Sequence, residues 1–184
     1  MKSILSRFWL MFALSACVMT PKQPALHDFG PVPGDSESAI QPIRKAVLSV
    51  DAPSWLWDNR IRYRLLYASP TKVGFYALDQ WIGAPPELFQ QRMMALGGAF
   101  PYALRIQLTE FEQQFNAADQ ARVVLSFAID AFSADSKRKL ASQAFHLEKP
   151  AKTPDAAGAV EAFGQLIRQA EANLETWLKT LPDQ

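Results

Sequence analysis

The 184-residue sequence is poor in the residues that build reactive centres, because it has one cysteine and two histidines. The histidines, His27 and His146, are widely separated and lack partners at metal-ligand spacing, which argues against a metal site. No G-x-S-x-G motif surrounds the loop serines Ser36, Ser38 and Ser54, and no glycine loop suited to phosphate is present. The sequence therefore predicts no catalytic residues, no cofactor and no ATP hydrolysis.

An excess of charge of one sign is also missing. The chain has 19 basic and 18 acidic residues, which leaves no basic footprint for nucleic acid. Glu110 and Glu112 alternate in a strand-like segment and so share one face, where a solvated surface explains them better than a catalytic carboxylate pair. We expect neither a nucleic-acid partner nor an enzyme.

A hydrophobic run long enough to span a membrane is absent from the N-terminal region. The apolar stretch from Phe8 to Ala16 has nine residues, whereas a spanning helix needs roughly 20. It follows Lys2 and Arg7 and finishes in small residues, which is typical of an export signal. A buried N-terminal helix is the alternative, but the prolines at positions 21 and 24 would break it.

The single cysteine lies directly after this run. Leu14-Ser15-Ala16-Cys17 resembles a bacterial lipobox, in which the cysteine thiol takes a diacylglycerol through a thioether and the chain is cleaved before the cysteine. An unpaired thiol is a liability in an oxidising periplasm, and acylation removes it. We predict a lipoprotein signal peptide over residues 1–16 and a lipid anchor, of palmitate type, on Cys17.

The anchor indicates where the protein works. Two or more acyl chains hold a protein firmly to a bilayer, so we expect membrane attachment without a transmembrane segment. Val18 stands where an Asp would favour retention in the inner membrane, so the outer membrane, facing the periplasm, is the expected location. Residues 17–24 form the lipidated tether, and residues 25–184 form one domain of ordinary size.

Apolar alternation predicts strands over 26–29, 43–50, 60–65, 74–77, 104–109, 123–130 and 138–147. Segment 60–65 should form a hairpin with 74–77 across the turn at Ser69-Pro70. Phe111 and Phe115 fall out of phase with the preceding apolar residues, which predicts a β-bulge near Glu110. Consecutive strands joined by short turns are antiparallel neighbours.

Two helices complete the pattern. The first, over 85–98, begins with prolines, carries Glu87 near its positive end and stops at a glycine. The second, over 154–178, has one apolar stripe made by Val160, Phe163, Ile167, Ala170, Leu174 and Trp177. The order of elements predicts an α+β fold, in which a mainly antiparallel sheet is covered by two helices in a single domain after the signal peptide.

Six sequence blocks occur in an order that resembles the ABC-type transport auxiliary lipoprotein component family: LHDFGP, APSWLWDNRIRYRLLYAS, FYALDQWIGAPPELFQQRM, LRIQLTEFEQQF, ARVVLSFAIDAF and AFHLE. They cover nearly the whole predicted mature chain. His27 stands near positions that family members often fill with Tyr. The resemblance implies a non-catalytic lipoprotein beside a lipid-handling ABC transporter, with a permease, an ATPase and a mammalian-cell-entry (MCE) domain protein as partners.

Aromatic and arginine side chains crowd the segment from residue 55 to residue 81, and such clusters are enriched in interface hot spots. The candidates for contact with a partner protein or a lipid are Trp55, Trp57, Arg62, Tyr76 and Trp81. Core packing is the alternative for Trp55 and Trp81. Trp55 and Trp57 point the same way only if their segment is extended, and we expect at least one of them to face a partner.

Two functions stay open on these grounds. The chain is either an auxiliary component of an ABC/MCE-type lipid-transport system, or an outer-membrane lipoprotein with a structural or assembly role and no transporter partner. The oligomeric state also stays open: a homo-oligomeric ring would allow a conduit, whereas a monomer would suit docking only. Adjacent genes for a permease, an ATPase and an MCE protein would favour the first.

Overall fold

The computed structural model describes residues 22–31, 48–94 and 101–181. The predicted signal peptide, Cys17, most of the tether, the serines at 36 and 38, most of the predicted strand 43–50 and the end of the predicted helix 85–98 therefore lie outside the described residues. Among the described residues, no helix combines the length and the apolar character needed to cross a membrane.

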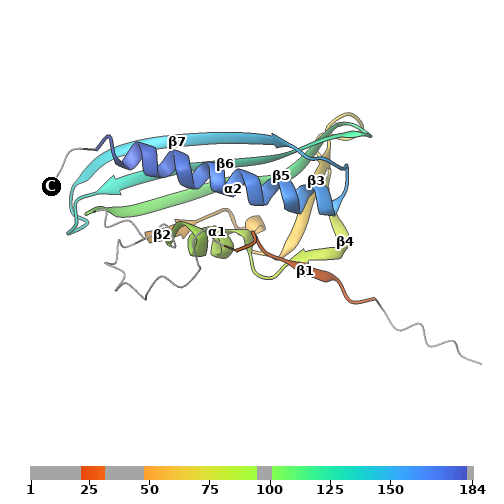
Figure 1. Ribbon diagram of the computed structural model, residues 1–184, viewed down its shortest axis with the longest axis horizontal. Coiled ribbons are helices and arrows are strands. Elements are labelled where there is room, and N and C mark those ends of the chain that lie inside the picture. Colours follow the sequence, from red (N-terminus) through yellow and green to blue (C-terminus); the bar gives the residue numbers. More distant parts are fainter. Residues whose placement is uncertain (1–21, 32–47, 95–100, 182–184) are drawn as a thin grey trace, which may run out of the picture.

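A seven-stranded sheet forms the body of the domain (Figure 1). Its strands are β1 (Ala25–His27), β2 (Leu48–Asp51), β3 (Arg60–Leu65), β4 (Val73–Trp81), β5 (Ala103–Ala117), β6 (Gln120–Phe132) and β7 (Lys139–Pro150). They lie in the order β1-β4-β3-β5-β6-β7, and β2 pairs with the first part of β5 while β3 pairs with its last part. β1 and β7 are thus the strands at the two ends of this order.

Whether two paired strands are antiparallel or parallel follows the length of the chain that connects them. The three pairs joined by short turns, β3–β4, β5–β6 and β6–β7, are antiparallel as the sequence predicts. The pairs β1–β4, β2–β5 and β3–β5 are parallel and join segments far apart in the chain. The predicted bulge is confirmed, because the β5–β6 register shifts between Leu108 and Glu110.

Two helices cover one face of the sheet, which confirms the predicted α+β class. α1 (Pro85–Met94) contacts β2, and α2 (Ala156–Leu178) runs lengthwise over β6 and β7 (Figure 1). The α2 stripe is buried at Phe163, Ile167, Ala170 and Leu174. A short 3₁₀ helix, η1 (Ser54–Leu56), precedes β3 and was not expected from the sequence.

Register assigns each side chain to a face, since residues directly opposite each other on antiparallel strands share one. Phe111, Leu125 and Leu147 form one row on the helix-covered face. The neighbouring row, made by Glu112, Val124 and Glu148, lies on the other side, here called the open face. The open face is polar over much of its area, whereas the helix-covered face contributes the core.

Candidate functional site

The five aromatic and arginine candidates do not form one site. Trp81 is 1% exposed and packs edge-on against Phe29, Phe111 and Phe163, with ring centroids 5.3 to 5.8 Å apart. The core alternative therefore holds for Trp81, whose burial leaves it no surface for a partner. The reason is register, because Trp81 lies beside His27 on the side of the sheet that α2 covers.

Tyr76 also faces the covered side, in a buried polar chain. Its hydroxyl donates to Gln113 Oε1 at 2.6 Å, and Gln113 Nε2 donates to the carbonyl of Asp155 at 3.2 Å. Gln113 is fully buried, so Tyr76 meets a hydrogen-bonding need of the core. Burial raises the pKa of the Tyr76 hydroxyl, with a smaller contribution from the charge of Asp155. The hydroxyl stays protonated and acts as a donor.

Arg62 lies on the open face but is largely buried, at 8% exposed. Its Nη2 lies 3.0 Å from Asp58 Oδ2, which also accepts from Arg60 Nη2 at 2.8 Å. Burial raises the pKa of Asp58, but the hydrogen bonds from Arg60 and the charge of Arg62 outweigh it and hold this pKa below its usual value. Arg62 therefore acts first as part of an ion pair that fixes the start of β3.

Trp55 and Trp57 are the candidates that reach the surface. Their side chains are 60% and 44% exposed, respectively. Trp57 is held in place because its Nε1 donates to the carbonyl of Ala52 at 3.1 Å. No hydrogen bond of Trp55 is found among the described residues, so Trp55 presents the larger and less constrained aromatic surface.

Beside η1 the open face carries a continuous polar network, which joins β3, β5, β6 and β7. Arg64 binds Glu112 through two hydrogen bonds of 2.9 and 3.1 Å. Gln114 Nε2 donates to both Glu110 and Glu112, at 2.9 and 3.0 Å. Because this amide touches both carboxylates, the prediction that they share one face is confirmed, while the 8% exposure of Glu112 shows that its position is not a solvated one.

The network continues toward the β7 edge. Ser126 Oγ donates to Glu110 Oε2 at 2.9 Å and lies 2.8 Å from His146 Nδ1. His146 Nε2 lies 3.2 Å from Glu148, which also pairs with Arg122. Most of the donors and acceptors in this network are paired, which stabilises the sheet and orients its side chains, whereas the buried Nε atoms of Arg62 and Arg122 make no hydrogen bond among the described residues.

A hollow of about 660 Å³ lies between η1 and this network. Trp55 forms one wall, and Arg62, Arg64, Glu110 and Glu112 are among its other lining residues. Acidic and basic groups are balanced around it, and an aromatic ring borders them. Such a hollow suits a partner side chain with both apolar and polar atoms.

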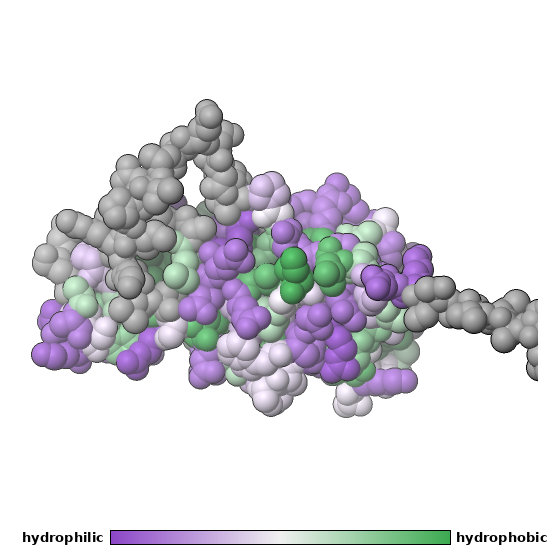
Figure 2. Space-filling view, turned by 90° about the horizontal axis from the view of Figure 1, so that it is seen from below, coloured by the Kyte–Doolittle hydropathy of each residue, from purple (hydrophilic) through white to green (hydrophobic). Residues whose placement is uncertain are grey.

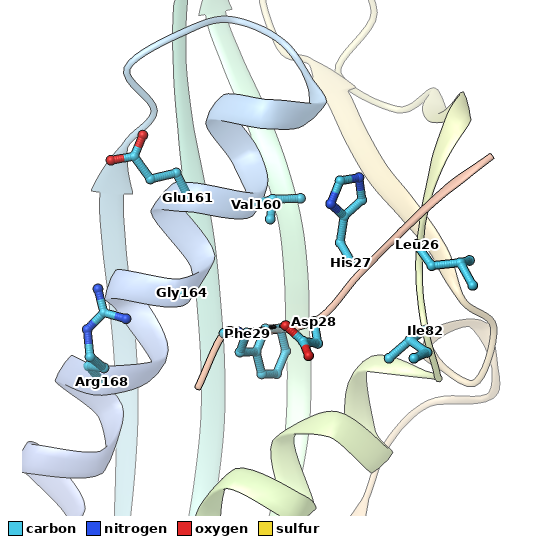
Figure 3. Close-up of a pocket in the computed structure, with 10 residues that line it drawn as sticks. Leu26, His27, Asp28, Phe29, Ile82, Val160, Glu161, Gly164 and Arg168 are labelled. Carbon is cyan, nitrogen blue, oxygen red and sulfur yellow. Dashed lines mark hydrogen bonds between the residues drawn. The ribbon is translucent and has the colours of Figure 1, made fainter. Parts of the chain in front are cut away.

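A second hollow, of about 450 Å³, lies where β1 meets α2 (Figure 3). His27 points toward Val160 of α2, and its Nε2 lies 2.9 Å from Asp79 Oδ1. Leu26, which points away from α2 (Figure 3), and Ile82 lie at the rim of this hollow and are 61% and 62% exposed. The sequence offered no signal for this exposure, because both residues have the apolar character of ordinary strand positions.

The chain after β1 is secured to both helices. Gly30 has φ of +76°, a left-handed conformation that favours glycine, and its carbonyl accepts from Arg92 Nη1 at 2.8 Å. Arg92 of α1 also binds Glu171 of α2 through two hydrogen bonds of 2.8 and 3.2 Å. One arginine thus joins α1, α2 and the segment that follows β1.

Comparison with solved structures supports the fold. Protein XCC0632 from Xanthomonas campestris, assigned to the family model DUF330, superposes with a TM-score of 0.62 at 18% identity, over 71% of this chain and 80% of that one. A crystal structure of an uncharacterised protein has the same TM-score at 14% identity, over 85% of this chain and 99% of that one. These identities are low, so the two likenesses concern the fold alone.

A third chain, provisionally described as a lipoprotein of Caulobacter crescentus CB15, aligns with a TM-score of 0.34 at 15% identity, over 52% of this chain and 83% of that one. This score is too low to bear on the fold or the function. No family model matches the sequence, and no curated protein matches it.

Proposed function

We propose that this chain is a lipid-anchored, non-catalytic auxiliary component of an ABC transport system that moves lipids through the bacterial envelope. It would be attached to the outer membrane, facing the periplasm, and would dock an MCE-domain protein that works with a permease and an ATPase. The observation that carries the proposal is the position of Cys17. It follows the apolar run directly and stands eight residues before Ala25, where β1 begins.

The sequence and the fold support the transporter role together. The blocks that resemble the auxiliary lipoprotein family fall on successive elements of one domain: LHDFGP on β1 and the turn after it, the APSWLWDNRIRYRLLYAS block on η1 and β3, and LRIQLTEFEQQF on β5. The block that covers η1 resembles the family in its Ala-Pro-Ser-Trp-Leu run, which includes Trp55. The aromatic pair at η1 is accordingly the surface that we assign to the protein partner.

The proposed chemistry at Cys17 determines attachment. Each buried CH₂ of an acyl chain contributes about 0.8 kcal/mol, and two or more chains give lasting attachment. A domain held in this way works by position, because it keeps its docking surface near the membrane. Docking needs a surface that offers both polar and aromatic groups. The open face supplies the polar groups, and η1 supplies the exposed aromatic side chains.

Metabolic labelling and co-purification test the proposal. Full-length chain and its Cys17→Ser variant are expressed with labelled palmitate, and label is expected on the first alone. Solubilised membranes are then examined for proteins that accompany the full-length chain, and an MCE protein with its permease and ATPase is the expected result. Label on the Cys17→Ser chain would contradict the anchor, and recovery of porins or assembly factors instead would favour the structural role.

A further inference from the structure

The β1 end of the sheet exposes large apolar side chains on its surface. Leu26 and Ile82 are each more than 60% exposed, and Leu78 of β4 is 44% exposed. Leu26 is paired in register with Gln80, so it shares a side of the sheet with residues two positions from Gln80, including Ile82. The Ile82 amide donates to the carbonyl of His27 at 2.8 Å, which keeps this residue beside β1.

The figures show the same arrangement. Leu26 points away from α2 (Figure 3), and Ile82 lies beside it at the same hollow. Seen from the side of β1 and α1, the molecule shows apolar surface bordered by hydrophilic residues (Figure 2). Scattered apolar residues are normal on a protein surface, but neighbouring ones rimmed by polar groups mark contact sites.

The tether limits what covers this surface. Seven residues separate Cys17 from Ala25, so the two lie eight Cα steps, or at most about 27 Å, apart even when the chain between them is fully extended. Leu26 is the next residue, so the apolar surface to which it belongs stays within a short reach of the anchor. A membrane to which Cys17 is attached lies within its reach at all times, whereas a protein partner must diffuse to it.

We propose that the β1 edge of the domain rests on the lipid bilayer, with Leu26 and Ile82 inserted among the lipids. This inference rests on the proposed anchor at Cys17. Insertion to the boundary between headgroups and acyl chains is the usual depth for apolar faces of peripheral proteins. The sheet then stands on β1, and β7 at the opposite end of the strand order points away from the membrane.

The charged groups near this surface are of both signs. His27 and Asp79 pair with each other, and Asp28 and Arg168 also line the adjoining hollow. The contact therefore depends on apolar insertion and not on attraction to anionic lipid. We expect the same insertion in vesicles of phosphatidylethanolamine and phosphatidylcholine, with or without phosphatidylglycerol.

Site-specific fluorescence in reconstituted vesicles tests this inference. Leu26→Cys and Ile82→Cys variants of the full-length chain are labelled with an environment-sensitive fluorophore, and Ala144→Cys on β7, also exposed, is the control. Lipids that carry a spin-label quencher should lower the emission at positions 26 and 82 by about two-fold, and hardly at position 144. Equal quenching at positions 82 and 144 would overturn the proposal.

Labelling of the unsubstituted chain distinguishes failure of the proposed membrane contact from failure of the proposed anchor at Cys17. Acylated Cys17 has no free thiol, so the unsubstituted chain should take up no fluorophore. Uptake there would show that the anchor itself is absent, and the membrane contact would fall with it. No uptake together with equal quenching at all positions would leave the anchor standing and reject the contact alone. Unchanged unfolding midpoints of the labelled variants confirm that they are folded.

Discussion

Arg92 and Glu171 form a two-point ion pair that joins α1 to α2 across 79 residues of sequence. Their side chains are 6% and 12% exposed, and Arg92 also donates to the Gly30 carbonyl. The pair therefore positions the helices and also the segment that follows β1. This contact thus holds the chain at the end of β1, the strand that follows the proposed anchor in the sequence.

Replacing Arg92 by Met should lower the free energy of unfolding by about 3 kcal/mol, because the largely buried carboxylate of Glu171 loses its partner. Urea denaturation of the full-length chain measures this loss. The control is the double variant Arg92→Met, Glu171→Leu, which removes both charges and should recover much of the stability. A double variant that is no more stable than Arg92→Met would show that the loss comes from the Gly30 contact or from packing.

Two glycines of α2 should respond in opposite ways to alanine. A Cβ at Gly158 would overlap the backbone carbonyl of Thr153, which has little room to move. A Cβ at Gly164 would meet the Phe29 carbonyl oxygen at 3.4 Å, an ordinary contact. Gly164→Ala should be neutral or stabilise by up to about 1 kcal/mol through helix propensity, whereas Gly158→Ala should destabilise. Thermal unfolding of the two variants compares them, and equal midpoints would contradict the close approach.

Asp155 at the start of α2 should make stability depend on pH in the acid range. The Thr153 hydroxyl and then the Gly158 amide hydrogen-bond its carboxylate and hold its pKa below the usual value. A lowered pKa in the folded state means that the unfolded chain binds protons more readily, so stability is full above about pH 4 and is lost as pH falls through the folded-state pKa.

Asp155→Ala should cost about 1 kcal/mol at neutral pH, because the helix loses its N-cap. Asp155→Asn keeps a capping oxygen and removes the titration, so it is the matched control. The difference in unfolding free energy between the native chain and Asp155→Asn should shrink as pH is lowered from 6 to 3. A difference that stays constant over this range would show that Asp155 does not titrate in the way its contacts imply.

The parts of this fold that follow from local pattern were predictable. β3 has the predicted bounds, Arg60–Leu65, because alternation of apolar and basic residues directly reports a half-buried strand. The bulge near Glu110 was visible as a change of phase. The parallel pairings of β2 and β3 with β5 could not be predicted in this way. Alternation indicates that a strand exists, but it does not indicate which distant strand it pairs with.

Which aromatic residues are buried could not be predicted from the sequence either, because burial depends on how the elements pack. Trp55 and Trp81 are both tryptophans in apolar surroundings, and only the arrangement of η1 against the open face and of β4 against α2 makes one exposed and the other buried. The burial of Arg62 could not be predicted either, because it depends on contacts with Asp58 and with Phe75. The ring centroid of Phe75 lies 5.3 Å from the guanidinium carbon of Arg62. Replacing Arg62 would disturb the ion pair as well as any contact with a partner.

Trp55 therefore offers the cleaner test of partner docking. Its side chain is 60% exposed and forms a wall of the hollow on the open face, and truncating an aromatic anchor at an interface typically costs 2 kcal/mol or more of binding, which is about a 30-fold loss of affinity. Trp55→Ala should weaken recovery of the MCE protein accordingly, with a change in unfolding free energy within about 0.5 kcal/mol. Tyr67→Ala is the control, since Tyr67 is also an exposed aromatic, at 51%, but does not line that hollow. If both variants retain the MCE protein as the native chain does, η1 is not the docking surface.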